Sequence, residues 1–165
     1  MEYNRPKIIL KLTALDLWLD RLAIVGMIFL WLYTITNYNA LPRIIPIHYD
    51  LSGKIDGYGE KLIIFLGPII ATVIASGLSL LNRYPHIFNY PASLTAENTE
   101  RQYMLATRLL RFIKMSVVCV FIYMNISIIH DANSKISSSG WWTLPLMLII
   151  IIAPITWYFF NAFKK

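Results

Sequence analysis

Four long apolar segments constrain this chain more than any other feature of its sequence. They cover residues 22–38, 62–81, 112–129 and 142–160, and each approaches the roughly 20 residues that a helix needs to cross a bilayer. Of the 165 residues, 57% are hydrophobic and 15% are charged, whereas a soluble domain carries about 25% charged residues. Helices of a soluble protein would also keep a polar face, which these segments lack. The pattern therefore predicts an all-α membrane protein, with four transmembrane helices in a single domain of residues 1–165.

The distribution of lysine and arginine predicts the orientation of these helices. If the N-terminus faces the cytoplasm, eleven of the 15 basic residues lie on the inner side. The outer ones are then Arg43, Lys54, Lys61 and Lys135. Because cytoplasmic loops of membrane proteins are enriched in lysine and arginine, this asymmetry predicts that both chain ends face the cytoplasm. The net charge of +6 is then explained by contact with anionic lipid headgroups and indicates no nucleic-acid partner.

Three stretches outside the spans have patterns of their own. Thr13 and Asp16 have the spacing of a capping box, so the first helix is expected to begin there, after an interfacial arm over residues 1–12. Residues 82–95 are rich in aromatic residues and proline, and we expect them to lie along the inner membrane surface. Residues 96–130 contain neither proline nor glycine. They predict one long helix whose first four turns extend into the cytoplasm.

This long helix carries charged and polar groups that need partners. Lys114, near the start of the third span, is expected to extend its side chain toward the headgroups. Asn125 lies deeper in the same span and is expected to make an interhelical hydrogen bond. Two interpretations remain open for Arg101, Arg108 and Arg111. Either they form a docking surface for a cytoplasmic protein, or the extension lies against lipid or its own bundle.

The segment between the first two spans, residues 41–61, holds most of the candidate binding residues. Its prolines stiffen an extended entry and its glycines permit tight turns, so we expect a structured outer loop. The candidates are Pro46, His48, Gly53, Asp56, Gly59 and Lys61. We expect His48, Asp56 and Lys61 to lie close together, because a carboxylate favours the charged forms of an imidazole and an ammonium group. Such a cluster is a scaffold of the loop, a binding surface for a peptide or lipid, or a metal site.

The spacing of residues in this loop is also similar to that of a known family. The pattern LPxxIPxHYxxxGxxDxxGxK resembles domain of unknown function sixteen-forty-eight, the N-terminal membrane domain of SdpI-type bacterial immunity proteins, and the chain looks like a small stand-alone member. The matching positions are Pro42, Ile45, Pro46, His48, Tyr49, Gly53, Asp56, Gly59 and Lys61. The resemblance implies immunity or sensing, with a peptide toxin or small ligand bound at the outer loop and a signal to a cytoplasmic protein. It also implies a multi-pass protein of the bacterial cytoplasmic membrane.

No motif in the sequence indicates catalysis. The candidate metal ligands on the outer side are His48, Asp50, His130 and Asp131. Their spacing matches no zinc motif such as HExxH. A hydrolase would need a nucleophile beside a base, and Ser52 and Tyr58, the candidates near His48, lie in no recognisable motif. The sequence therefore favours a non-enzymatic protein without a cofactor. The alternative is a membrane enzyme or transporter whose site combines the outer loop with the outer end of the third helix.

Overall fold

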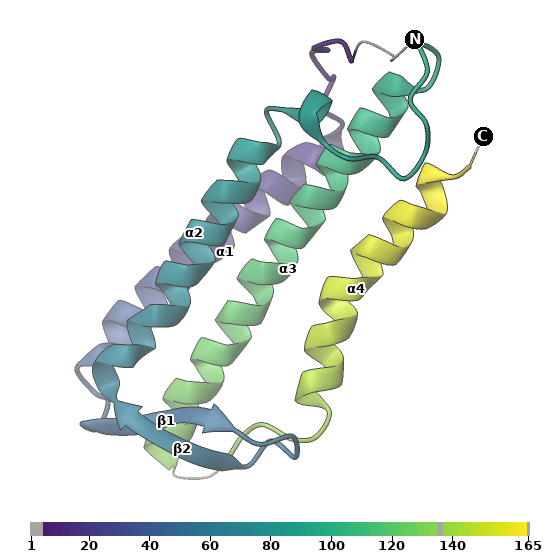
Figure 1. The fold of residues 1–165 in the computed structure, drawn as a ribbon. Coiled ribbons are helices and arrows are strands. Elements are labelled where there is room, and N and C mark those ends of the chain that lie inside the picture. Colours follow the sequence, from purple (N-terminus) through teal and green to yellow (C-terminus); the bar gives the residue numbers. More distant parts are fainter. Residues whose placement is uncertain (1–4, 135–136, 165) are drawn as a thin grey trace.

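Four long helices and one β-hairpin make up the described part of the chain. The computed structural model describes residues 5–134 and 137–164, and its long helices lie side by side (Figure 1). α1 begins and α4 ends at one end of the bundle, which we call the terminal end, and the hairpin lies at the opposite end, the hairpin end. In chain order the elements are α1 (Ala14–Tyr38), β1 (Ile44–Tyr49), β2 (Ile55–Glu60), the 3₁₀ helix η1 (Lys61–Phe65), α2 (Leu66–Leu81), the 3₁₀ helix η2 (Pro85–Ile87), α3 (Thr99–Ser134) and α4 (Thr143–Ala162).

The hairpin is where the predicted all-α fold is wrong. Residues 41–61 were expected to form a structured loop, and most of them form a two-stranded antiparallel sheet instead. The strands are six residues each and are joined by a turn over residues 50–54. A two-stranded sheet is only marginally stable alone in water, so this one depends on packing against the helices.

The central helix of the bundle is α3. α1, α2 and α4 each pack along it, whereas α1 and α2 contact each other only slightly. With 36 residues and about 1.5 Å of rise per residue, α3 is roughly 54 Å long, well beyond the roughly 30 Å of a hydrocarbon core. The predicted long helix is thus confirmed, although it begins at Thr99, after a turn over residues 96–98.

Asn125 joins three elements near the hairpin end, as predicted. The Thr34 hydroxyl of α1 donates a hydrogen bond to Asn125 Oδ1 at 3.0 Å, and Asn125 Nδ2 donates to the Ile64 carbonyl of η1 at 3.3 Å. Thr34 and Asn125 are both buried. Buried amide groups need such partners, because an unsatisfied polar group in an apolar interior costs about 1–3 kcal/mol.

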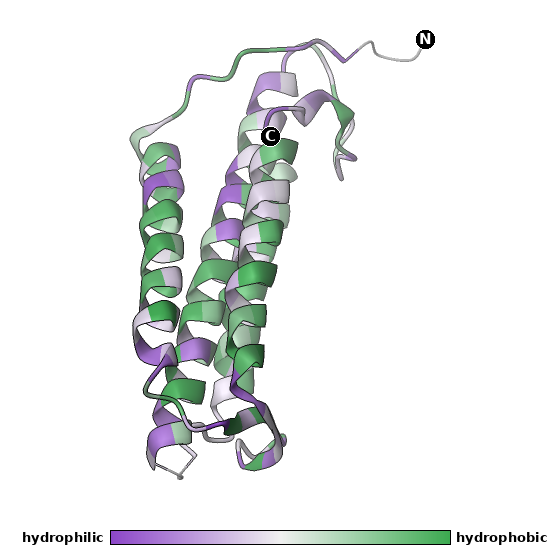
Figure 2. Cartoon of the chain, turned by 90° about the vertical axis from the view of Figure 1, so that its left-hand side faces the viewer, coloured by the Kyte–Doolittle hydropathy of each residue, from purple (hydrophilic) through white to green (hydrophobic). Residues whose placement is uncertain are grey.

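Three helical segments in the described chain are long and apolar enough to cross a membrane. They are Lys61–Leu81, Thr99–Ser134 and Thr143–Ala162. In the most apolar stretch of the last segment only 6% of the residues are buried inside the chain, as expected of a helix that faces lipid. Hydrophobic residues dominate the middle of the bundle (Figure 2). The predicted first span, residues 22–38, lies within α1, which is helical over its whole length but is not one of the three segments.

The predicted capping box begins α1 and also connects it to α3. The Thr13 backbone N–H donates to Asp16 at 2.9 Å, and the Asp16 backbone N–H donates to the Thr13 hydroxyl. Arg108 of α3 donates to both Asp16 carboxylate oxygens, at 2.8 and 3.1 Å. Burial alone would raise the pKa of Asp16, but the hydrogen bonds from Arg108 and Thr13 outweigh it and lower the pKa to about 2.

All three arginines of the predicted docking surface bond within the chain. Arg101 donates to two backbone carbonyls at the end of α4, at 2.8 and 2.5 Å. Arg108 bonds the carboxylate of Asp16. Arg111 donates from Nε to Asp20 at 3.0 Å, and its side chain is 8% exposed. These contacts turn the arginines toward neighbouring helices and give the predicted cytoplasmic docking surface no support. The extension of α3 lies against its own bundle.

The segment over residues 82–95 covers the first turns of α3. Tyr90 stacks on Tyr103 with 5.5 Å between ring centroids, and its hydroxyl donates to the Pro85 carbonyl at 2.7 Å. From the arm before α1, Arg5 donates to a backbone carbonyl of the same segment. Within the predicted interfacial arm, residues 5–12 have no regular secondary structure, and residues 1–4 lie outside the described chain.

Candidate functional site

The hairpin packs onto the end of α3 through its first strand. Ile45 and Pro46 are fully buried, and Ile45 belongs to a core cluster with Leu41, Ile64 and Ile129. The strand register shifts between Pro46 and His48 and again between His48 and Tyr49. Proline has no N–H for the ladder, so the first irregularity beside Pro46 is expected.

His48 and Asp56 form a close pair on the hairpin, as predicted. His48 Nδ1 lies 2.5 Å from Asp56 Oδ1, and the two side chains are 71% and 45% exposed. Gly57 stands opposite His48, and a Cβ there would come within 2.8 Å of the His48 Cβ. Gly59 is similarly tight against the Ile47 side chain. The exposed pair contributes little stability, on the order of 1 kcal/mol or less.

The turn of the hairpin is organised by Asp50 and Gly53. One Asp50 carboxylate oxygen accepts from the Ser52 N–H, the Ser52 hydroxyl and the Lys54 N–H, at 2.8, 2.7 and 2.9 Å. These hydrogen bonds lower the pKa of Asp50, and the bond from the Ser52 hydroxyl has the largest effect. Gly53 has φ of 81°, and a Cβ there would meet the backbone of Gly140 at 2.8 Å. Only glycine fits this turn, because its backbone conformation is left-handed and the segment before α4 lies in contact with it.

Lys61 does not join His48 and Asp56, so this part of the predicted cluster is wrong. Its ammonium group donates to the carbonyls of Tyr38 and Leu41, at 3.2 and 3.4 Å, and lies 4.6 Å from the centroid of the Tyr38 ring. A cation at this place caps the C-terminal end of α1, where carbonyls lack helical partners. Lys61 therefore fixes the exit of α1 against the start of η1.

Asp131 connects the hairpin with the end of α3 and with the segment before α4. Its side chain is fully buried and accepts from the Tyr49 hydroxyl at 3.0 Å and from the Ser138 N–H at 2.7 Å. His130 Nδ1 lies 3.1 Å from the same carboxylate. Burial, together with the bond to Asp131, raises the pKa of Tyr49 well above its usual value. The sequence suggested Asp131 only as a metal ligand, and its role as a structural clamp was not predicted.

The four candidate metal ligands have different neighbours in the structure. His48 pairs with Asp56, Asp50 caps the turn, and His130 adjoins Asp131. Across residues 5–134 and 137–164, no three His, Cys, Asp or Glu side chains gather closely enough to hold a metal ion.

A pocket of about 270 Å³ lies between the hairpin, α3 and α4, and we call it the hairpin pocket. His48, Tyr49 and Asp50 line it from the hairpin, and Met124 and Met147 line it from the helices. Most of its wall is apolar, with a few polar groups near the turn. This composition is typical of sites for small apolar ligands or side chains.

Comparison with known proteins supports the resemblance for part of the chain. Residues 25–72 match the family model described as Domain of unknown function (DUF1648). The predicted resemblance is confirmed for this segment. Over 80 residues the chain is also 35% identical to an uncharacterized protein of Archaeoglobus fulgidus, an alignment that covers 44% of each protein. The chain thus spans less than half the length of that relative. No solved structure matches the chain significantly.

The DUF1648 segment, residues 25–72, contains all six candidate residues of the hairpin region. In the structure they have different tasks. Pro46 is buried against the bundle, Gly53 turns the hairpin, and Lys61 caps α1. The other side of the hairpin pocket comes from α3 and α4, outside the DUF1648 segment. The family pattern therefore describes one wall of the site.

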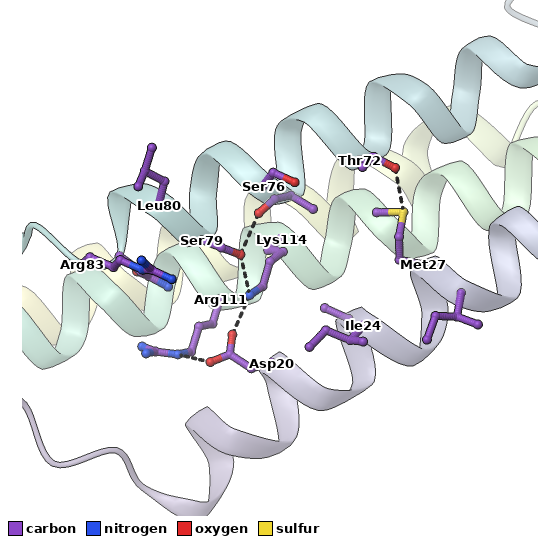
Figure 3. A pocket seen from close by; sticks show the side chains of 14 residues that line it. Asp20, Ile24, Met27, Thr72, Ser76, Ser79, Leu80, Arg83, Arg111 and Lys114 are labelled. Carbon is purple, nitrogen blue, oxygen red and sulfur yellow. Dashed lines mark hydrogen bonds and ion pairs between the residues drawn. The ribbon is translucent and has the colours of Figure 1, made fainter.

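A second polar cluster lies outside the DUF1648 segment, at the terminal end. Lys114 Nζ donates to Asp20 at 2.6 Å and to the Ser79 hydroxyl at 3.1 Å, and Arg111 bonds the other Asp20 oxygen. Figure 3 shows these side chains meeting from α1, α2 and α3. The Lys114 side chain is 8% exposed, so the prediction that it extends to the headgroups is wrong. We call Asp20, Ser79, Arg111 and Lys114 the Asp20 cluster.

Proposed function

We propose that the chain crosses the membrane four times, with both ends in the cytoplasm and the hairpin outside. α1 has 25 residues and packs along α3, which is one of the three apolar segments, and this supports its counting as the fourth span. Of the 13 described lysines and arginines, ten belong to the terminal end and three to the hairpin end. Lys135 and Lys165, which also enter the charge count, lie outside the described residues. A basic terminal end favours the cytoplasmic side.

Cysteine labelling tests this orientation. Replacing Cys119, the single cysteine, by serine gives a background without thiols. Cysteines at Ser52 and Ser138, both exposed at the hairpin end, should then react with a membrane-impermeant maleimide in intact cells. A cysteine at Ser93, exposed at the terminal end, should react only after the membrane is opened. Labelling of intact cells at Ser93 alone would mean that the orientation is inverted.

At the hairpin end the chain acts as a receptor of the immunity or sensing class. The observation that carries this proposal is the hairpin pocket, whose wall joins the family pattern of the hairpin to α3 and α4. Its volume of about 270 Å³ is just below the roughly 300 Å³ at which ligand sites usually begin, and it suits a side chain of a peptide toxin or a small apolar ligand. Occupation would pull the hairpin toward both helices, which offers a route for a signal toward the terminal end.

The role at the hairpin end is binding without catalysis. The Ser52 hydroxyl donates to Asp50, and Tyr58 is 62% exposed on the other strand, so neither candidate nucleophile is bonded to His48. His48 is instead held by Asp56. This arrangement supports a scaffold or binding role for the pair, and it gives no support to the alternative of an enzyme or transporter site that also includes His130.

Filling the hairpin pocket should abolish its function. Bacteria that produce the chain should survive better than bacteria without it when they are challenged with a panel of purified membrane-active peptide toxins. Met147→Trp puts a larger side chain into the pocket and should reduce this protection by about tenfold or more, as a loss of about 1.4 kcal/mol of binding would. Survival at graded toxin concentrations measures the effect.

The neighbouring residue supplies the control. Leu148 is 48% exposed toward the surroundings of α4 and does not line the pocket, so Leu148→Trp should keep full protection. Equal losses of protection in both variants would mean that a bulky residue anywhere on this part of α4 disturbs the chain, and that filling the pocket is not the cause. Absence of protection against the whole panel would contradict the immunity role.

A further inference from the structure

A cavity of about 730 Å³ lies at the terminal end beside the Asp20 cluster, and we call it the terminal-end cavity. It is lined by α1, α2 and the residues just after α2, with Arg111 and Lys114 contributed by α3 (Figure 3). α1 and α2 each pack on α3 but contact each other only slightly, which leaves this space between them. Its volume is within the roughly 300–1,000 Å³ that is usual for ligand sites.

The lining of the terminal-end cavity carries an excess of positive charge. Asp20 is the single acidic side chain among the described lining residues, and it faces Arg111 and Lys114. Arg83, exposed at the end of α2, adds a third cation. One carboxylate neutralises one of the three, so the lining is left with a net charge near +2. A basic recess between transmembrane helices attracts an anion.

Two buried polar atoms in this lining have no partner within the described chain. One is Nη1 of Arg111, a side chain that is 92% buried, and the other is Oδ1 of Asn82. A buried guanidinium donor without a partner costs about 1–3 kcal/mol or more, so it needs an acceptor from outside the described chain. Phosphate oxygens are the acceptors that arginine binds best, and a headgroup hydroxyl would suit the Asn82 oxygen.

The other part of the cavity is apolar. Ile24, Met27 and Ile28 of α1 and Ala75 of α2 line it, and Thr72, which accepts a hydrogen bond from Trp31, lines the far end. From Ser79 to Thr72 the cavity follows α2 for seven residues, or about 10 Å. A free inorganic anion would leave this apolar part empty, whereas the start of an acyl chain would fill it.

We propose that the terminal-end cavity binds an anionic phospholipid, with the phosphate at Arg111 and Arg83 and the acyl chain between α1 and α2. The site lies at the opposite end of the bundle from the hairpin pocket and does not depend on the receptor role proposed there. The Asp20 cluster holds Arg111 in place for the phosphate, since Asp20 bonds its Nε and leaves Nη1 available.

Lipid binding to the purified full chain tests the proposal. Delipidated protein in neutral detergent is titrated with phosphatidylglycerol or phosphatidylcholine, and bound lipid is counted by native mass spectrometry. Phosphatidylglycerol should bind about tenfold more tightly. Arg83→Gln should weaken that binding about fivefold, because each basic group near an anionic lipid adds a favourable interaction of about that size. Arg111→Gln should weaken it about tenfold or more, since its bond is buried.

Controls separate the site from general charge attraction. Arg21 is exposed on α1 at the same end but does not line the cavity, so Arg21→Gln should leave phosphatidylglycerol binding within about twofold of the parent. Ser76→Phe fills the apolar part without changing charge and should weaken phosphatidylglycerol binding. If Arg111→Gln fails to fold, the pair of Arg83→Gln and Arg21→Gln still decides the question.

Three outcomes would overturn the proposal. One is equal binding of phosphatidylglycerol and phosphatidylcholine. Another is an equal loss in Arg21→Gln and Arg83→Gln, which would assign the binding to surface charge. The third is binding of inorganic phosphate at least as tightly as phosphatidylglycerol and unchanged by Ser76→Phe, which would make the site one for a free anion.

Discussion

Replacing Asp20 by alanine should destabilise the folded chain by about 3–5 kcal/mol. The carboxylate accepts from Lys114 at 2.6 Å and from Arg111 at 3.0 Å, and both basic side chains are 8% exposed. In lipid-free protein, removing it leaves two buried cations without an anion, which is among the most costly changes in a folded protein. Unfolding of the purified, delipidated chain in neutral detergent, followed by circular dichroism, measures the loss.

Two further variants isolate the cause of the Asp20→Ala effect. Glu60→Ala removes a carboxylate whose partner, Arg43, is 3.7 Å away and 87% exposed, so this change should cost less than about 1 kcal/mol. Adding Lys114→Met to Asp20→Ala should restore part of the stability, because it removes one of the unpaired charges. If Asp20→Ala costs no more than Glu60→Ala in this lipid-free protein, water reaches the two cations and the cluster is not closed.

The helices could be predicted from the sequence because each depends on a local pattern. Thr13 and Asp16 satisfy the start of α1 within four residues, and the absence of proline and glycine between Thr99 and Ser134 allows α3 to continue. These features need no knowledge of the rest of the fold. Asn125 was also predictable in kind, since an amide in an apolar helix must find a partner, although Thr34 and Ile64 could not be named in advance.

The hairpin was not predicted because the residues of this segment favour different local structures. Pro46 within a short apolar run favours a loop or an edge strand, and Gly57 and Gly59 weaken a strand on propensity alone. The pairing depends on contacts distant in sequence. Ile45 packs with Ile129, and Tyr49 bonds Asp131 across 82 positions. Packing of this kind overrides local preference and cannot be deduced from the loop itself.

The Asp20 cluster was also missed, although the sequence contained a signal for it. Asp16 and Asp20 are four residues apart, and Arg108, Arg111 and Lys114 are three residues apart, so each set lies on one helix face. Two acidic residues on one helix and three basic ones on another indicate interhelical pairing. Interpreting the basic residues one at a time, as a docking surface or as contacts to headgroups, hid this complementarity.

Asp131→Ala should detach the hairpin from the bundle and cost about 3–4 kcal/mol. The variant leaves the Tyr49 hydroxyl and the Ser138 N–H without their acceptor, and hydrogen bonds to a buried charged group contribute about 1.5–3 kcal/mol each. The hairpin has few other polar ties to α3, so its amides over residues 44–60 should exchange with solvent much faster. Hydrogen exchange followed by mass spectrometry measures this locally, and detergent unfolding measures the total loss.

Asp56→Ala provides the matched comparison, because it removes a carboxylate from the same hairpin. Asp56 bonds His48 alone among the described residues, and both side chains are largely in contact with solvent. Its loss should therefore cost less than about 1 kcal/mol and leave exchange of the hairpin amides nearly unchanged. If Asp56→Ala accelerates exchange as much as Asp131→Ala does, the hairpin is held by its own internal pair. The clamp on α3 would then be secondary, and the hairpin pocket would lack the fixed wall that ligand binding requires.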